Sequence, residues 1–308
     1  GIRDSVASRG LGDVYKRQVL VAGGTGRAVL KEGEEEPLFR GNKDLNSAEI
    51  YDPKTDEWEN APDMAYKKQL AQAITLEDGR VMIIGGRSGV STLNSIEVYD
   101  PESNSWSELE PMIQSRMAHS AVKLIDNRIL VTGGMSSVTM GDTLSLTEIY
   151  DPVENSWSTA SELNRARLGH RATLLPDGRV LVTGGTTVEE GDLLGPETTA
   201  EIYDPISNEW TLIATELVPR KDHSAVLVPG GKVILIGGGD PIGTGVLPVE
   251  AYDIENDQWS VISYLPEGRN LLTVTPLRDG SIMVVGGGTV KGYIAEFPDH
   301  TLKYRITN

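Results

Sequence analysis

VMIIGG at 81–86, ILVTGG at 129–134 and VLVTGG at 180–185 are three of six copies of one pattern, an apolar run that ends in two glycines. The other copies are VLVAGG at 19–24, VILIGG at 233–238 and IMVVGG at 282–287. The copies recur about every 50 residues, and a repeat of this length predicts a radial or stacked array of similar units. No single copy can bury its own apolar faces, so the copies are expected to pack on one another.

Each unit is expected to contain four antiparallel strands. An apolar stretch such as HSAVKL at 119–124 precedes a tight turn and the glycine run, and both strands should be buried. A variable loop then leads to a third strand: AEIYDP at 48–53, IEVYDP at 96–101, TEIYDP at 147–152, AEIYDP at 200–205 and VEAYDI at 249–254. A fourth strand begins at a tryptophan: Trp58, Trp106, Trp157, Trp210 and Trp259. These repeated tryptophans are interpreted as packing residues between adjacent sheets.

An acidic or amide residue stands two positions before each tryptophan: Asp56, Asn104, Asn155, Asn208 and Asp257. We expect a left-handed backbone there, because Asn and Asp tolerate it best among residues with a side chain. Six such units predict an all-β, six-bladed propeller with four-stranded antiparallel blades, because radial closure protects the edges of small sheets. In the last unit, AEFPDHTLKY at 295–304 is read as the third strand, a turn and the fourth strand, with Tyr304 near the tryptophan position.

Residues 1–18 match none of the repeats. They resemble translated adapter or vector sequence of the kind fused to metagenomic reading frames, and they lack the apolar core of a signal peptide. We therefore interpret 1–18 as a non-native leader and 19–308 as the propeller. On this reading the first blade lacks its own first strand.

The glycine pair after an apolar strand, followed by Glu-x-Tyr-Asp-Pro and then Asx-x-Trp, resembles the kelch repeat over about 19–304. The resemblance implies a kelch β-propeller, and we interpret the chain as a bacterial or metagenomic kelch-repeat protein. It implies little about function, because one fold hosts binding modules and enzymes alike.

A basic residue stands thirteen positions before each of five glycine runs: Lys68, Arg116, Arg167, Arg220 and Arg269. Radial symmetry would place them as a ring at one mouth of the central channel. In kelch adaptors of ubiquitin ligases, arginines at this position contact acidic peptides, so these five residues are the candidate ligand-binding residues. The alternative is structural, with each cation paired to a Glu or Asp of a neighbouring blade or bound to loop carbonyl groups.

Three histidines follow three positions later: His119, His170 and His223. Faces of packed sheets lie about 10 Å apart, so histidines that point into different interfaces are poorly placed to share a metal. We expect structural hydrogen bonds, no metal site and no cofactor.

The composition limits the partners. The net charge of −17 disfavours nucleic acid, whose binding requires neutralisation of phosphates by Lys and Arg. No apolar stretch approaches the ~20 residues of a membrane helix, so membrane insertion is not expected. The chain has no cysteine, which excludes the copper site of the galactose oxidase family and fits either side of a membrane. The sequence does not determine the location, and an extracellular or periplasmic one is favoured.

Three functions remain open. The first is a non-catalytic module that binds a protein segment or an acidic glycan through the basic ring. The second is a sugar-active enzyme of the sialic acid mutarotase type, for which the sequence singles out no catalytic acid. The third is a structural module of a larger secreted or surface protein.

Overall fold

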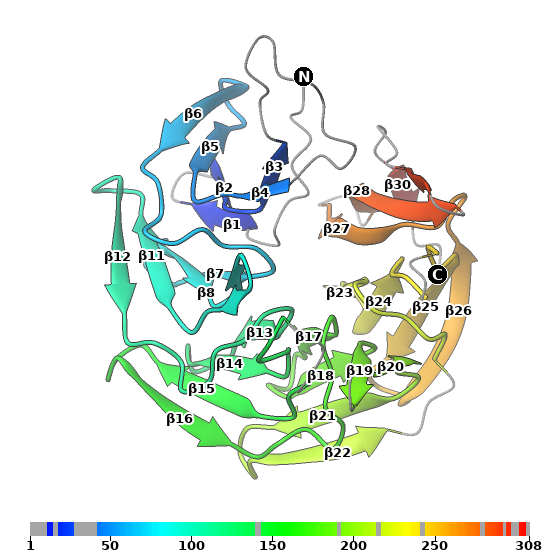
Figure 1. Cartoon of the computed structure of the whole chain (residues 1–308). Helices are drawn as coiled ribbons and strands as arrows, with labels where there is room; N and C mark the ends of the chain where they lie inside the picture. The colour runs from blue at the N-terminus through cyan, green and yellow to red at the C-terminus, as the bar shows by residue number, and fades with distance from the viewer. Residues whose placement is uncertain are drawn as a thin grey trace. The chain divides into compact units, whose positions relative to one another are not determined.

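A computed structural model of the chain describes residues 11–14, 18–27, 42–138, 143–189, 192–213, 217–240, 244–277, 281–291, 294–296 and 302–305. The chain forms two compact units: Gly1–Ile129 with Ser136–Thr139 and Glu148–Ser158, and Leu130–Met135 with Met140–Thr147 and Thr159–Asn308. Every regular element in the described residues is a β-strand. Most of the strands form six antiparallel sheets, the blades of the predicted β-propeller, which confirms the all-β fold class (Figure 1).

Most blades hold four antiparallel strands in chain order, here called positions A, B, C and D. Blade one contains β1 (Leu11–Val14), β2 (Gln18–Ala22), β5 (Ala48–Asp52) and β6 (Glu57–Ala61). Blade two contains β7 (Gln72–Thr75), β8 (Val81–Ile84), β11 (Ile96–Asp100) and β12 (Ser105–Leu109). Blade three contains β13 (Ser120–Lys123), β14 (Ile129–Thr132), β15 (Thr147–Asp151) and β16 (Ser156–Ala160).

The later blades repeat this plan. Blade four contains β17 (Arg171–Leu174), β18 (Val180–Thr183), β21 (Ala200–Asp204) and β22 (Glu209–Ile213). Blade five contains β23 (Ser224–Val228), β24 (Lys232–Ile236), β25 (Pro248–Asp253) and β26 (Gln258–Tyr264). Blade six departs from it: β29 (Ile294–Glu296) and β30 (Leu302–Arg305) both pair with β28 (Ser281–Lys291), whose other neighbour is β27 (Asn270–Pro276).

The variable loops between positions B and C carry small hairpins of their own. They are β3 (Thr25–Arg27) with β4 (Asn42–Asp44), β9 (Arg87–Ser88) with β10 (Ser91–Thr92), and β19 (Thr186–Glu189) with β20 (Asp192–Pro196). The B-to-C loops and the D-to-A segments meet at one end of each sheet, because antiparallel neighbours run in opposite directions. We call this the loop end, and the opposite end, with the A-to-B and C-to-D turns, the turn end.

Burial follows strand position. All four residues of β8, β14 and β18 are buried, as their unbroken apolar sequences predict. The D strands β12, β16 and β22 are largely exposed and turn one side, with the tryptophan, toward the blade. Core clusters form around Leu20 and Val81 in the first unit and around Leu181 and Ile234 in the second. The cores therefore lie between blade faces, which leaves the loops at the ends of the strands available for function.

Blade one corrects one expectation. Strand β1 pairs antiparallel with β2, with Leu11 opposite Val21 and Val14 opposite Gln18. The first blade therefore has a strand at position A, drawn from the segment interpreted as a leader. The boundary between leader and propeller at Val19 stays a prediction.

Blade six corrects another. Tyr304 lies opposite Ile282, the first apolar residue of its glycine run. In blades two and four the matching register joins Val81 to Tyr99 and Val180 to Tyr203, which belong to the Tyr-Asp motif of position C. Strand β30 therefore occupies position C, and Tyr304 takes the tyrosine position, not the tryptophan position.

The predicted left-handed residues are confirmed. Asp56, Asn104, Asn155, Asn208 and Asp257 have φ values between 47° and 61°. The glycine pairs also adopt positive φ, and at Gly184 a Cβ would lie 2.4 Å from the carbonyl oxygen of Arg220. Only glycine fits there, which explains why the apolar run ends in this residue.

Candidate functional site

The five predicted basic residues lie in the D-to-A segments, just before strand A of blades two to six. Their side chains are almost completely buried: Lys68, Arg116, Arg167 and Arg269 are 0% exposed and Arg220 is 1% exposed. Isolated charges at such depth are very unfavourable, so each one requires a partner.

The partner is a glutamate of strand C in four blades. The ion pairs are Lys68–Glu97 at 3.4 Å, Arg116–Glu148 at 2.5 Å, Arg167–Glu201 at 2.8 Å and Arg220–Glu250 at 2.5 Å. Each pair joins the segment that enters strand A to strand C of the same blade. These glutamates belong to the Glu-x-Tyr-Asp motif, and their role was not predicted from the sequence.

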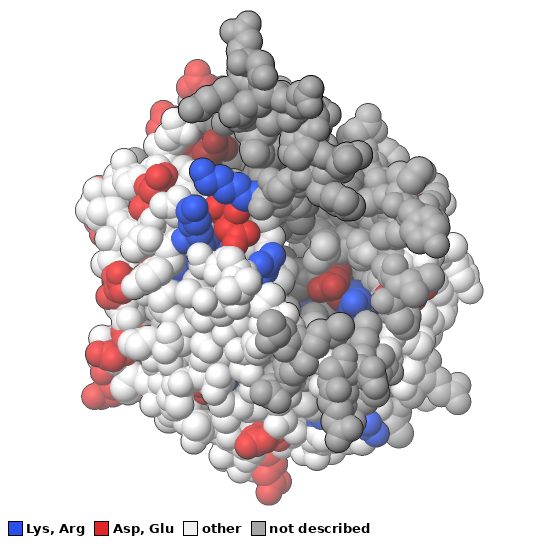
Figure 2. All heavy atoms as spheres, in the orientation of Figure 1, with Lys and Arg blue, Asp and Glu red and all other residues white. Residues whose placement is uncertain are grey.

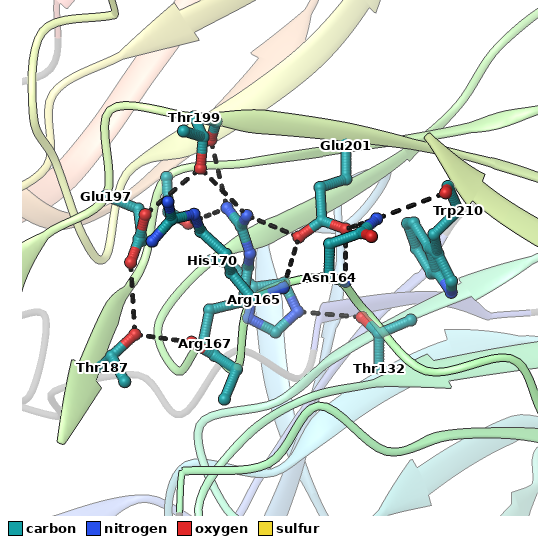
Figure 3. Close-up of polar contacts among 12 residues, drawn as sticks. Thr132, Asn164, Arg165, Arg167, His170, Thr187, Glu197, Thr199, Glu201 and Trp210 are labelled. Carbon is teal, nitrogen blue, oxygen red and sulfur yellow. Dashed lines mark hydrogen bonds and ion pairs between the residues drawn. The ribbon is translucent and has the colours of Figure 1, made fainter. Parts of the chain in front are cut away.

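The glutamates also hold the backbone of the same segments. Glu201 accepts hydrogen bonds from the backbone N–H groups of Asn164 at 2.7 Å and Arg165 at 3.1 Å (Figure 3). Arg167 in turn donates to the carbonyl oxygens of Gly184 at 2.9 Å and Thr199 at 3.1 Å. The buried pair therefore fixes the shape of the D-to-A segment at the loop end of the blade.

Blade six has lost the glutamate and compensates for the loss. In this blade Tyr304 stands at the position of the motif tyrosine. The glutamate position lies two residues earlier and is occupied by Leu302. Arg269 binds Glu267 instead, at 2.5 Å, and donates to the carbonyl oxygen of Gly286 at 3.2 Å. A cation thus keeps a carboxylate partner even where the repeat pattern changes.

Burial shifts the pKa of the cations that pair with a glutamate of strand C. It lowers the pKa of Lys68 to about 8, although the carboxylate of Glu97 acts in the opposite direction. Burial also lowers the pKa of Arg116, Arg167 and Arg220, and their glutamate partners again oppose the change. The ligand-binding role of the five basic residues stays a prediction, because a ligand would have to displace a buried carboxylate to reach any of them.

The three histidines are fully buried, and two of them form the expected hydrogen bonds. The Nε2 atoms of His170 and His223 lie 2.9 and 2.8 Å from the hydroxyl groups of Thr132 and Thr183. In the glycine run that precedes His119, Ile84 stands at the position of Thr132 and Thr183 and has no hydroxyl group to offer. Neither ring nitrogen of His119 has a hydrogen-bond partner. Burial, together with the nearby basic side chains, holds the pKa of His119 well below its usual range. The described residues contain no cluster of three or more groups able to hold a metal ion.

Trp106, Trp157 and Trp210 contact the segment that leaves the preceding blade, as predicted, whereas Trp58 is 56% exposed and none of the five lies in the buried core. Trp157 donates its Nε1–H to the carbonyl oxygen of Glu110 at 2.8 Å, and Trp210 to that of Ser161 at 2.9 Å. The buried aromatic residue is instead the tyrosine of strand C. Tyr203 donates a 2.9 Å hydrogen bond to the side chain of Asn208, which stabilises the C-to-D turn.

A second set of left-handed residues lies two positions after the basic residues: Leu70, Ala118, Gly169, Asp222 and Leu271 have φ values between 52° and 65°. Their backbones link neighbouring blades. Asp222 donates to the carbonyl oxygen of Gly169 at 2.8 Å, and Ala118 donates to that of Leu70 at 3.1 Å. Only one of the five is glycine, so residue type could not reveal this conformation.

No helix among the described residues is long and apolar enough to cross a membrane.

Comparisons with known proteins agree with this architecture. The family model of the KLHDC2/KLHL20/DRC7 Kelch-repeats domain matches residues 33–185 and 72–288. Kelch-like protein 35 of Mus musculus is 33% identical over 134 residues, 43% of this chain and 22% of the relative. Alpha-scruin of Limulus polyphemus is 29% identical over 143 residues, 46% of this chain and 15% of the relative. The F-box/kelch-repeat protein SKIP30 of Arabidopsis thaliana is 28% identical over 155 residues, 48% of this chain and 44% of the relative.

The chain spans less than half the length of each of these relatives. They come from two animals and a plant, and the bacterial origin inferred from the sequence stays a prediction.

Proposed function

Because this chain belongs to the kelch-repeat family, we propose that it is a non-catalytic interaction module whose loop end binds a segment of a partner protein. The observation that carries the proposal is the set of buried cation–carboxylate pairs that hold the D-to-A segments. These pairs make a rigid base from which B-to-C loops of different lengths project. Loops on a rigid scaffold are the usual location of binding residues.

The loop end also presents apolar side chains to solvent. Val90, at the tip of the β9–β10 hairpin, and Ile113, in the next D-to-A segment, are both exposed. The two elements are joined by a 3.0 Å hydrogen bond between the side chains of Thr92 and Ser115. Contiguous exposed apolar surface is typical of protein-binding sites, and Val90 and Ile113 are the candidate residues for such a surface at the loop end.

The proposal can be tested by selecting peptides from a random display library with the full chain. The enriched peptides are then measured against the double variant Val90→Ser/Ile113→Ser and against a control, Ile125→Ser/Val153→Ser, with two equally exposed residues at the turn end of the same unit. We expect the loop-end variant to bind at least about tenfold more weakly, a loss of ~1.4 kcal/mol, and the control to bind like the wild type. Equal binding by both variants, or no enriched peptide, would contradict the proposal.

Two alternative functions are kept beside this proposal. One is that the partner is an acidic glycan, and the other is that the chain is a sugar-active enzyme of the sialic acid mutarotase type. Either would require a sugar carboxylate to be held by cations at the loop end. Titration with N-acetylneuraminate, followed by an anomer-exchange measurement, separates both from a peptide-binding function.

A further inference from the structure

Strand β26 is the outermost strand of blade five and differs from the other strands at position D (Figure 1). It has seven residues, whereas β6, β12, β16 and β22 have five each. Its inner side pairs with β25, and no strand of the described residues pairs with its outer side. The outer side of such an edge strand presents backbone N–H and C=O groups that can pair with another strand.

The side chains that β26 exposes most are apolar. Val261, Ile262 and Tyr264 are between 40% and 65% exposed. The pairing of β25 with β26 shifts between Val249 and Glu250, which makes Ile262 an extra residue of β26. A bulge of this kind leaves one side chain outside the regular ladder. It therefore adds Ile262 to the apolar side chains that accompany the free edge.

Strand β26, QWSVISY at 258–264, also carries no charged residue. Natural proteins usually protect an exposed edge strand from pairing with charged residues or proline. Three other strands at position D have such protection, from Glu57 and Glu59 in β6, Glu108 in β12 and Glu209 in β22. Figure 2 shows acidic side chains on the outer rim over β6 and β12. Strand β16 is uncharged as well, but it exposes no large apolar side chain.

The net charge of the chain favours a second copy as the partner of this edge. Each copy carries a charge of −17, so two copies repel each other wherever acidic surfaces meet. A basic partner would be attracted to an acidic rim, whereas a partner with the same negative charge needs an uncharged strand on which to pair. Antiparallel pairing about a two-fold axis lets β26 serve as its own partner, because both copies present the same strand.

We propose that two copies of the chain associate by antiparallel pairing of their β26 strands, which continues the sheet of blade five from one copy into the other. Backbone hydrogen bonds join the two strands, and the apolar side chains of each copy pack on those of the other. The pairing uses both free edges, so the assembly closes as a dimer. The contact involves the outer edge of the blade and not its loop end, so the inference is independent of the proposed peptide-binding function.

The test is sedimentation velocity of the full chain over a range of protein concentrations, at low and at high salt. The edge variant is Val261→Lys, and Ile262→Lys is a second variant of the same strand. The matched control is Leu212→Lys, because Leu212 lies opposite the strand C glutamate of blade four, as Val261 does in blade five. Leu212 and Val261 are 44% and 47% exposed, and both substitutions change the net charge equally. Thermal unfolding of each variant checks that the fold is retained.

We expect the wild type and Leu212→Lys to dimerise alike, and both edge variants to dimerise at least about tenfold more weakly, because a lysine on an edge strand opposes pairing. Raising the salt concentration should strengthen the wild-type dimer, since screening reduces the repulsion between two acidic chains.

A wild type that stays monomeric at every concentration, or that forms larger aggregates in place of a dimer, would overturn the inference. A control weakened as much as the edge variants would overturn it as well. The loop-end variant Val90→Ser/Ile113→Ser should dimerise like the wild type, and a loss of its dimer would place the contact at the loop end and contradict the role of β26. Peptide binding by Val261→Lys at the wild-type level would show that the two functions are separate.

Discussion

The substitution Glu201→Gln tests whether the buried pairs hold the loop end together. Glu201 and Arg167 form a 2.8 Å pair, and both side chains are 0% exposed. Glutamine keeps the shape of the side chain but removes the charge, which leaves the guanidinium of Arg167 buried without a counter-charge. Breaking a buried pair in this way costs roughly 3–5 kcal/mol, because the remaining ion has lost its solvent and its partner.

The loss of stability is measured as the decrease in the free energy of unfolding in urea. Thermal unfolding of the same variant provides a second measurement. Glu209→Gln is the matched control, because Glu209 is an exposed residue of the same blade. A surface substitution of this kind should change stability by less than about 0.5 kcal/mol. The single variant Arg167→Met and the double variant Glu201→Gln/Arg167→Met complete a double-mutant cycle that isolates the coupling between the two side chains.

The double variant should recover part of the stability lost by Glu201→Gln alone, because the unpaired charge is gone. A loss below about 1 kcal/mol for Glu201→Gln, or no coupling between the two positions, would refute the reasoning. The pair would then not determine the shape of the D-to-A segment, and the rigid base on which the proposed function rests would need another origin.

Three further predictions concern the repeat positions. Lys68→Arg should raise stability by about 1–2 kcal/mol, because arginine can reach Glu97 with two donors. Between pH 8 and the ordinary lysine pKa of 10.5, the unfolded wild type binds a proton that folded Lys68 has released, so wild-type stability should rise through this range relative to the Arg variant. A parallel pH profile of the two proteins would contradict the lowered pKa. Tyr203→Phe should cost about 1 kcal/mol in urea unfolding through loss of the hydrogen bond to Asn208, and a neutral result would remove that bond from the account of the turn. Ala118→Gly should be neutral or stabilising by up to about 1 kcal/mol, against the usual cost of this change, because its φ is 52°; a thermal shift downward would show that the methyl group matters more than the backbone.

The architecture was predictable because each repeat carries local signals. The glycine run, the Tyr-Asp motif and the tryptophan mark strands B, C and D, and their order determines the topology of each blade. The left-handed turn at Asn208 and its counterparts followed from residue type alone, since Asn and Asp tolerate this conformation in any context.

Positions where the repeat weakens were harder to predict. The last unit lacks the Glu-x-Tyr-Asp sequence, so only the pairing of Tyr304 with Ile282 revealed which strand it belongs to. Strand β1 has no counterpart in the repeat pattern, and its pairing with β2 depends on backbone hydrogen bonds that any residue type can form.

The sequence by itself determined the number of blades, the strands within them and the recurrence of a basic residue before strand A. Only the tertiary structure decided what that residue does, because burial and the choice of partner depend on segments far apart in the chain. Arg167 meets Glu201 across 34 residues, and Lys67 and Lys68 are identical neighbours in the sequence. Lys68 is buried against a carboxylate while Lys67 faces a pocket, since consecutive side chains of an extended segment point to opposite sides.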